Sequence, residues 1–150
     1  MRIEYPLGIP PKHPIQEFKF STSLQTIEIG DHSLRLSTIE DLEPAIDQVF
    51  EWLSLNALPQ SEMENLAPFF GKLWPSAIAL AEKLAAIFKR SSSNRQNLIE
   101  LGCGLGLPGL IAKKFGVEAT LTDNHPCVPS FLEKNLAYND IDSVKYFLLS

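Results

Sequence analysis

Apolar and polar residues follow two different patterns along the chain. The first pattern covers the amino-terminal part. Between Ile15 and Ile39 they partly alternate, and Gly30-Asp31 interrupts the alternation. Alternation of period two on both sides of a turn predicts a β-hairpin. Asp41 can cap a helix over 42–55, because the apolar residues of that stretch fall on one helical face. These residues are Ala45, Val49, Trp52 and Leu53.

The second pattern covers the carboxyl-terminal part and predicts helices that alternate with short apolar strands. After a polar stretch at 59–65, Pro75-Ser76 opens a helix whose apolar residues predict a single buried face. That face comprises Ala77, Leu80, Ala81, Leu84 and Phe88. The elements that follow are a strand at 97–101, a helix at 108–115, a strand at 119–122, a helix at 126–138 and a strand at 144–149. Strand–helix alternation with short links predicts a parallel sheet built from βαβ units.

These elements predict an α/β fold, a partial doubly wound parallel sheet of the Rossmann-like type, preceded by a hairpin and a helix. We expect a proline-rich tail at 1–14, the hairpin and helix at 15–66, and the amino-terminal half of a sheet domain at 67–150. The first strand of a doubly wound sheet is central, so Leu98, Ile99 and Leu101 are expected to be buried on both faces. Only two parallel strands follow it. We therefore expect a truncated domain, in which one edge of this strand is unpaired unless the hairpin or a second chain covers it.

Composition and charge narrow the classes of function. Hydrophobic residues make up 45% of the chain and charged residues 21%, which is a globular composition. A net charge of −5 with basic residues in ones and twos disfavours a dedicated nucleic-acid binder. The longest apolar stretch, 77–88, contains Glu82-Lys83 and is shorter than the roughly 20 residues of a membrane span. Two cysteines and a start unlike a signal peptide favour a cytoplasmic protein with no membrane partner.

A glycine-rich turn joins the strand at 97–101 to the next helix. Glycine allows positive φ angles and lets a ligand approach the backbone closely. Read as Gly104-x-Gly106-x-x-Gly109, the turn matches the dinucleotide fingerprint, and Asp123 lies about the expected distance further on. This spacing therefore leaves an NAD-dependent dehydrogenase as one candidate.

The same turn can be read as Glu100-x-Gly102-x-Gly104-x-Gly106, which is the turn that holds S-adenosylmethionine. The acidic residue inside the strand separates the two interpretations. A carboxylate there would repel a pyrophosphate but can meet an ammonium group. S-adenosylmethionine has an amino-acid end and no phosphate, so Glu100 favours this cofactor.

Three motifs in order along the chain resemble those of the seven-β-strand S-adenosylmethionine-dependent methyltransferases. The motifs are Gly71-x-x-Trp74-Pro75-Ser76-Ala77, the turn from Glu100 to Gly109, and Thr120-Leu121-Thr122-Asp123. The chain is most similar to the branch with protein lysine and arginine methyltransferases and nicotinamide N-methyltransferase-like proteins. The resemblance implies a methyl acceptor that is a protein side chain or a small amine. It places the acceptor-side residues after Ser150, so no catalytic residue is predicted.

The resemblance also implies a role for each residue of the cofactor site. Glu100, with the backbone of Gly102, Gly104 and Gly106, would hold the methionine end of S-adenosylmethionine. Asp123 would take both ribose hydroxyls. Trp74 would pack beside the cofactor, and Asn124 would touch the adenine.

Simpler explanations stay open for several of these residues. Asp123 could cap the next helix, Trp74 could be a core aromatic residue, and the glycine turn could serve strand–helix packing. His125-Pro126-Cys127 lacks the second cysteine of a P-C-x-x-C pair, because position 130 is Ser130, and no metal site is predicted. At the level of function, the alternatives are a truncated cofactor-binding module without turnover and a fragment of a dehydrogenase.

Overall fold

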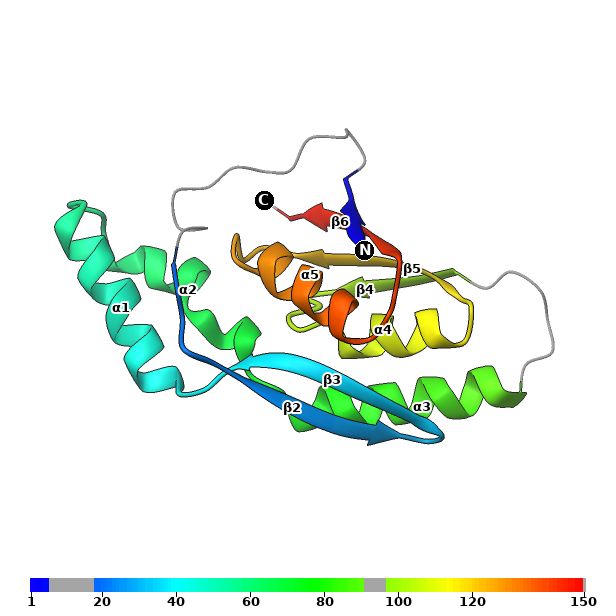
Figure 1. Ribbon diagram of the computed structural model, residues 1–150. Helices are drawn as coiled ribbons and strands as arrows, with labels where there is room; N and C mark the ends of the chain where they lie inside the picture. Colours follow the sequence, from blue (N-terminus) through cyan, green and yellow to red (C-terminus); the bar gives the residue numbers. More distant parts are fainter. Residues whose placement is uncertain (6–17, 91–96, 150) are drawn as a thin grey trace.

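A four-stranded parallel sheet organises the fold in the computed structural model, which describes residues 1–5, 18–90 and 97–149 (Figure 1). The order of its strands is β1-β6-β5-β4. The strands are β1 (Arg2–Glu4), β4 (Asn97–Leu101), β5 (Glu118–Asp123) and β6 (Ser143–Leu148). All three pairings are parallel, so the predicted α/β fold with a partial parallel sheet is confirmed.

The amino-terminal hairpin forms a separate two-stranded antiparallel sheet. Its strands are β2 (Thr22–Ile29) and β3 (His32–Ile39), and Ile29 is paired with His32 across the turn. Gly30 lies in that turn with a φ of 58°. The predicted hairpin is therefore confirmed, including its turn.

Helices α4 and α5 lie between the sheet and the hairpin. Figure 1 shows the sheet on one side of them and the hairpin with α3 on the other. Because α4 is enclosed in this way, residues 107–112 are all buried. The helices are α1 (Leu42–Leu55), α2 (Met63–Leu66), α3 (Pro75–Arg90), α4 (Leu107–Lys114) and α5 (Val128–Tyr138), with 3₁₀ turns η2 (Gln60–Glu62) and η3 (Pro68–Gly71). Within the described ranges, no helix combines the length and apolar composition that a membrane crossing needs.

The beginning of the chain belongs to the sheet. We expected residues 1–14 to form a tail, but Ile3 pairs with Val144 of β6 and is buried. Tyr5 then packs edge-on against Tyr146, with 6.2 Å between ring centroids. Three residues just before Pro6 carry too little periodicity to predict a strand, and their pairing partner β6 is far away in the sequence. Residues 6–14 lie outside the described part.

Strand β4 lies at the edge of the sheet among the described strands. It pairs with β5 alone, and the hairpin does not cover its free edge. Ile99 is 69% exposed and Leu101 75% exposed, so the expectation that this strand is buried on both faces is wrong for the described structure. The described helices α4 and α5 cover only the face that carries Leu98 and Glu100.

Two further features of the structure were not predicted. The polar stretch at 59–65, for which no element was predicted, contains η2 and most of α2. On α3 the expected buried face includes Leu80, but that side chain is 47% exposed. Ala81 and Ala85 are the buried residues of α3, because α3 packs closely on α4 through small side chains. The helix predicted from Asp41 is confirmed, and Asp41 accepts a hydrogen bond from the N–H of Glu43.

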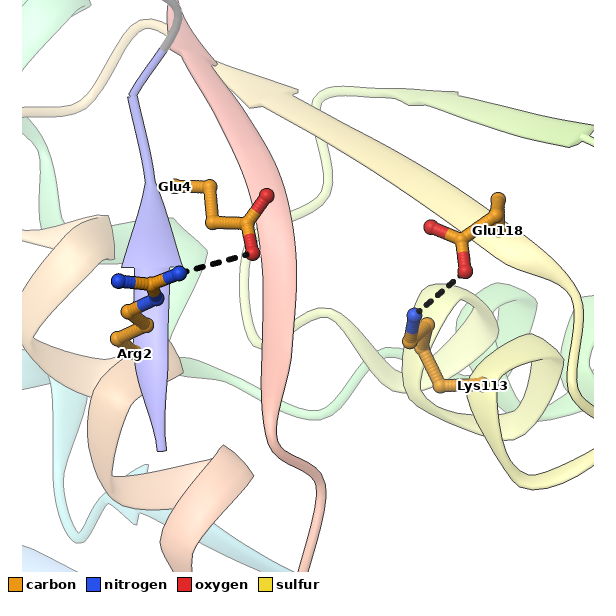
Figure 2. A network of polar contacts seen from close by, with 4 residues as sticks. All are labelled: Arg2, Glu4, Lys113 and Glu118. Atoms are coloured by element: carbon orange, nitrogen blue, oxygen red, sulfur yellow. Dashed lines mark hydrogen bonds and ion pairs between the residues drawn. The ribbon is translucent and has the colours of Figure 1, made fainter. Parts of the chain in front are cut away.

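Ion pairs add little to this architecture. Figure 2 shows Arg2 and Glu4 within β1, 3.9 Å apart, and Lys113 of α4 with Glu118 at the start of β5, 3.3 Å apart. Each pair has at least one solvent-exposed partner, and exposed pairs contribute roughly 0–1 kcal/mol. Apolar packing on both sides of α4 and α5 therefore supplies most of the stabilisation.

Candidate cofactor-binding site

The glycine turn connects β4 to α4 in a conformation that requires glycine. Gly104 has a φ of 51°, and a Cβ atom there would lie 3.0 Å from the carbonyl oxygen of Phe70. Gly106 has a φ of 78°, and its Cβ would lie 2.6 Å from a methyl carbon of Leu132. Any other residue at these positions would meet both backbone strain and a close contact.

Hydrogen bonds fasten this turn to the end of β5. The N–H of Cys103 donates to the carbonyl of Thr122, and the N–H of Gly104 donates to Oδ2 of Asp123, both over 2.8 Å. Within the turn, the N–H of Gly106 donates to the carbonyl of Cys103. The carboxyl ends of the two strands are thereby held together, which is where open α/β sheets bind their ligands.

Asp123 is buried, with 6% of its surface exposed. Its second carboxylate oxygen, Oδ1, accepts a hydrogen bond from the N–H of His125 over 2.9 Å. Asp123 does not cap α5, whose N-cap residue is Cys127 and has no side-chain cap. Two carboxylate oxygens offer about four acceptor positions, so the two backbone N–H groups leave room for hydroxyl donors.

The side chain of Glu100 is bonded to the backbone at the start of α4. Its Oε2 accepts a hydrogen bond from the N–H of Gly109, in the first turn of α4, over 2.8 Å. Burial raises the pKa of Glu100 to about 8; the bond from Gly109 opposes this shift, and the charge of Asp123 adds to it. Glu100 therefore holds the start of α4, and its burial favours the protonated form of its carboxyl group.

A cavity of about 400 Å³ opens beside the turn. All seven residues predicted for the cofactor site line it: Trp74, Glu100, Gly102, Gly104, Gly106, Asp123 and Asn124. The structure therefore brings together a residue just before α3, the glycine turn and residues at the end of β5. A Cβ added at Gly102 would meet no atom within 4 Å, so the space beside the turn is open to a ligand.

Trp74 and Asn124 lie at the exposed parts of this cavity. Trp74 is 43% exposed, which is not the environment of a core aromatic residue. Its indole N–H donates to the carbonyl of Phe69 over 3.0 Å, and Nζ of Lys72 lies 4.8 Å from the centre of its ring. These contacts hold the indole against η3 at the wall of the cavity.

Two further residues that line the cavity, Phe70 and His125, were not predicted from the sequence. Their ring centroids are 4.2 Å apart. Nδ1 of His125 accepts from the N–H of Cys127, so the neutral tautomer carries its proton on Nε2, which lies 3.0 Å from the carbonyl of Leu66. His125 thus links the β5–α5 loop to the segment between α2 and η3. The nearest signal in the sequence was the position of Phe70 directly before Gly71 of the first motif.

The described residues contain no group of three or more His, Cys, Asp or Glu side chains placed to bind a metal ion. The cavity is lined by backbone amides, by the carboxyl groups of Glu64, Glu100 and Asp123, by Lys72 and by aromatic rings. Such a wall suits an organic ligand with hydroxyl and cationic groups and a flat ring.

Comparison with known proteins identifies this arrangement. The family described as "Lysine methyltransferase" matches residues 57–149, a range that contains the residues lining the cavity. The chain belongs to the lysine methyltransferase family. Members of this family are S-adenosylmethionine-dependent methyltransferases, so the resemblance predicted from the three motifs is confirmed. Membership in this family argues against the dehydrogenase alternative.

Individual relatives in the lysine methyltransferase family match over shorter ranges. The human histone-arginine methyltransferase METTL23 is 40% identical over 52 residues, which cover 35% of this chain and 26% of that protein. The bovine protein-lysine methyltransferase METTL21E is 37% identical over 67 residues, 45% of this chain and 21% of that protein. The matches span about a quarter of the length of these relatives. Among solved structures, a Pyrococcus horikoshii protein named as a transferase, PH0793, is 13% identical with a TM-score of 0.41, covering 83% of this chain and 55% of that one.

Proposed function

We propose that this protein transfers a methyl group from S-adenosylmethionine to a nitrogen of a lysine or arginine side chain, and that the cavity beside the glycine turn holds the cofactor. One observation carries the proposal: the seven residues suggested by the motifs line a single cavity within the range matched by the family. Its volume falls in the range of small-molecule sites. A small amine remains the alternative acceptor.

Each residue would hold a different part of the cofactor. Asp123 has acceptor positions left for ribose hydroxyls after its bonds to Gly104 and His125. Glu100 would lie near the ammonium group, and Trp74 and Asn124 would flank the cofactor at the wall and the rim. The bound cofactor would supply an electrophilic methyl group on a sulfonium. The contribution of this chain is to position that cofactor and to exclude water from it, because methyl transfer depends on approach in line.

Calorimetry with S-adenosylhomocysteine and with NAD tests the cofactor. We expect heat from the first ligand and none from the second, and tighter binding of NAD would overturn the proposal. Asp123→Asn should weaken binding, whereas Asp47→Asn on the exposed face of α1 makes the same change of charge away from the cavity and should not.

Transfer of a labelled methyl group tests the acceptor. Lysine-rich proteins, arginine-rich proteins and nicotinamide are offered in parallel as substrates. Label in a protein supports the proposed acceptor, and label in nicotinamide alone would assign the small amine instead. Cofactor binding without any transfer would identify a binding module that does not turn over.

A further inference from the structure

Two asparagines on α5 fasten the hairpin to the rest of the molecule. Asn135 and Asn139 are four residues apart on the helix, which corresponds to a rise of about 6 Å. Arg35 and Ser37 are two residues apart on β3, a span of about 6.7 Å. The spacing of the two asparagines along α5 matches the spacing of the two residues along β3. Each asparagine therefore accepts a hydrogen bond from one N–H group on the outer edge of β3.

Asn139 pairs with β3 as a neighbouring strand would. Its Oδ1 accepts from the N–H of Arg35 over 2.8 Å, and its Nδ2 donates to the carbonyl of the same residue over 2.7 Å. Nδ2 also donates to the carbonyl of Asn135 in its own helix. The bonds of this side chain therefore end at the hairpin and at α5.

Asn135 makes a different connection. Its Oδ1 accepts from the N–H of Ser37 over 2.7 Å, and its Nδ2 donates to the carbonyl of Leu105 over 3.1 Å. Leu105 lies in the glycine turn, between Gly104 and Gly106. One amide group with no exposed surface thus bridges β3 to the turn that lines the cavity.

Removal of this amide would affect both of its partners. The N–H of Ser37 and the carbonyl of Leu105 would lose the bonds that this side chain gives them, in a buried place where water cannot easily replace them. The turn would then keep its hydrogen bonds to the end of β5 and lose its hydrogen bond to the side chain of residue 135 on α5.

We propose that Asn135 is a positioning residue of the cofactor site, which sets the conformation of the glycine turn by bonding it to the hairpin. The identity of the ligand that binds beside this turn rests on the proposed function. The coupling itself is a property of the chain and can be measured without any ligand. Asn139 provides a matched control, because it docks the same strand from the same helix and does not bond to the turn.

Amide hydrogen exchange in the full chain tests the coupling. In Asn135→Leu we expect the amides of residues 103–107 to exchange about tenfold faster than in the parent protein, the scale of one lost buried hydrogen bond. In Asn139→Leu the same amides should change less than twofold, while those of β3 exchange faster. Equal acceleration in the turn of both variants would show that Asn135 acts only on overall stability and would overturn the proposal.

Asn135→Asp supplies a second variant that has nearly the shape of the parent side chain. It preserves the shape and the acceptor toward Ser37, while its ionised form cannot donate to Leu105. Relative to the parent protein, exchange of the turn amides should again accelerate more than exchange of the β3 amides. An unchanged turn in Asn135→Asp at a pH where the new carboxyl is ionised would also overturn the proposal.

Affinity for S-adenosylhomocysteine adds a functional measurement. We expect about tenfold weaker binding by Asn135→Asp and a change below twofold for Asn139→Leu. If the parent protein binds no S-adenosylhomocysteine, the proposed function fails, and the exchange of the turn amides still decides the role of Asn135.

Discussion

Oδ2 of Asp123 lies 2.8 Å from the backbone nitrogen of Gly104, and this bond connects the end of β5 to the middle of the glycine turn. The side chain that would receive a ribose is therefore also one that shapes the turn. Cofactor binding and the conformation of the turn depend on the same carboxylate. Substitutions at this position should consequently change both affinity and stability.

For Asp123→Ala, we expect binding of S-adenosylhomocysteine to weaken by roughly 1.5 to 3 kcal/mol, the scale of hydrogen bonds to a charged group. The N–H groups of Gly104 and His125 also lose their acceptor, so the melting temperature should fall. Calorimetry and thermal unfolding measure the two effects, with Asp47→Ala as the control. Unchanged affinity together with a lower melting temperature would leave Asp123 with a structural role alone.

The pH dependence of stability should report on Glu100. Its pKa is about 8 in the folded protein and near 4.5 when unfolded, so the folded state binds the extra proton between these values. The free energy of unfolding should therefore decrease as pH rises from 4.5 to 8, by on the order of a few kcal/mol. Urea unfolding across this range measures it. Glu100→Gln keeps an acceptor for Gly109 and should flatten the profile; a profile equally steep in that variant would assign the effect to other groups.

Binding of the cofactor should release a proton if its ammonium group lies near Glu100. A nearby cation favours the ionised carboxylate and lowers its pKa, so part of the Glu100 population deprotonates at pH 7. Calorimetry in buffers with different ionisation enthalpies counts the protons released. We expect a number between zero and one for the parent protein and a value close to zero for Glu100→Gln. No release from the parent protein would place the ammonium away from this side chain.

The free edge of β4 should cause self-association. Among the described strands, β4 pairs on one edge only, so its other edge and the exposed Ile99 and Leu101 offer hydrogen-bonding groups and apolar surface to another chain. Light scattering at increasing concentration should show oligomers, and Ile99→Lys should shift them toward monomer. Leu55→Lys is the control, because Leu55 is equally exposed at the end of a helix. Oligomers that persist in Ile99→Lys would indicate another interface.

Much of the sheet and one wall of the cavity could be predicted from local sequence. The glycines of the turn and Asp123 occupy fixed places relative to β4 and β5, so their meeting at one sheet edge follows from the parallel topology. The roles of Glu100 and Asp123 within the apoprotein were not predictable, because the groups that they bind are backbone N–H groups. Phe70 and His125 come together only through tertiary packing. The exposure of Leu80 likewise depends on how closely α3 approaches α4, which periodicity does not specify.

The pairing of β1 with β6 affects the order in which the sheet can assemble. Arg2–Glu4 are synthesised long before their partners at Ser143–Lys145. Such distant pairing must close a long loop before any contact compensates for the lost chain entropy, which slows folding. A chain emerging from the ribosome can thus form β4, α4 and β5 while β1 still has no neighbour. Strand β1 can therefore pair with β6 only after translation has passed β6.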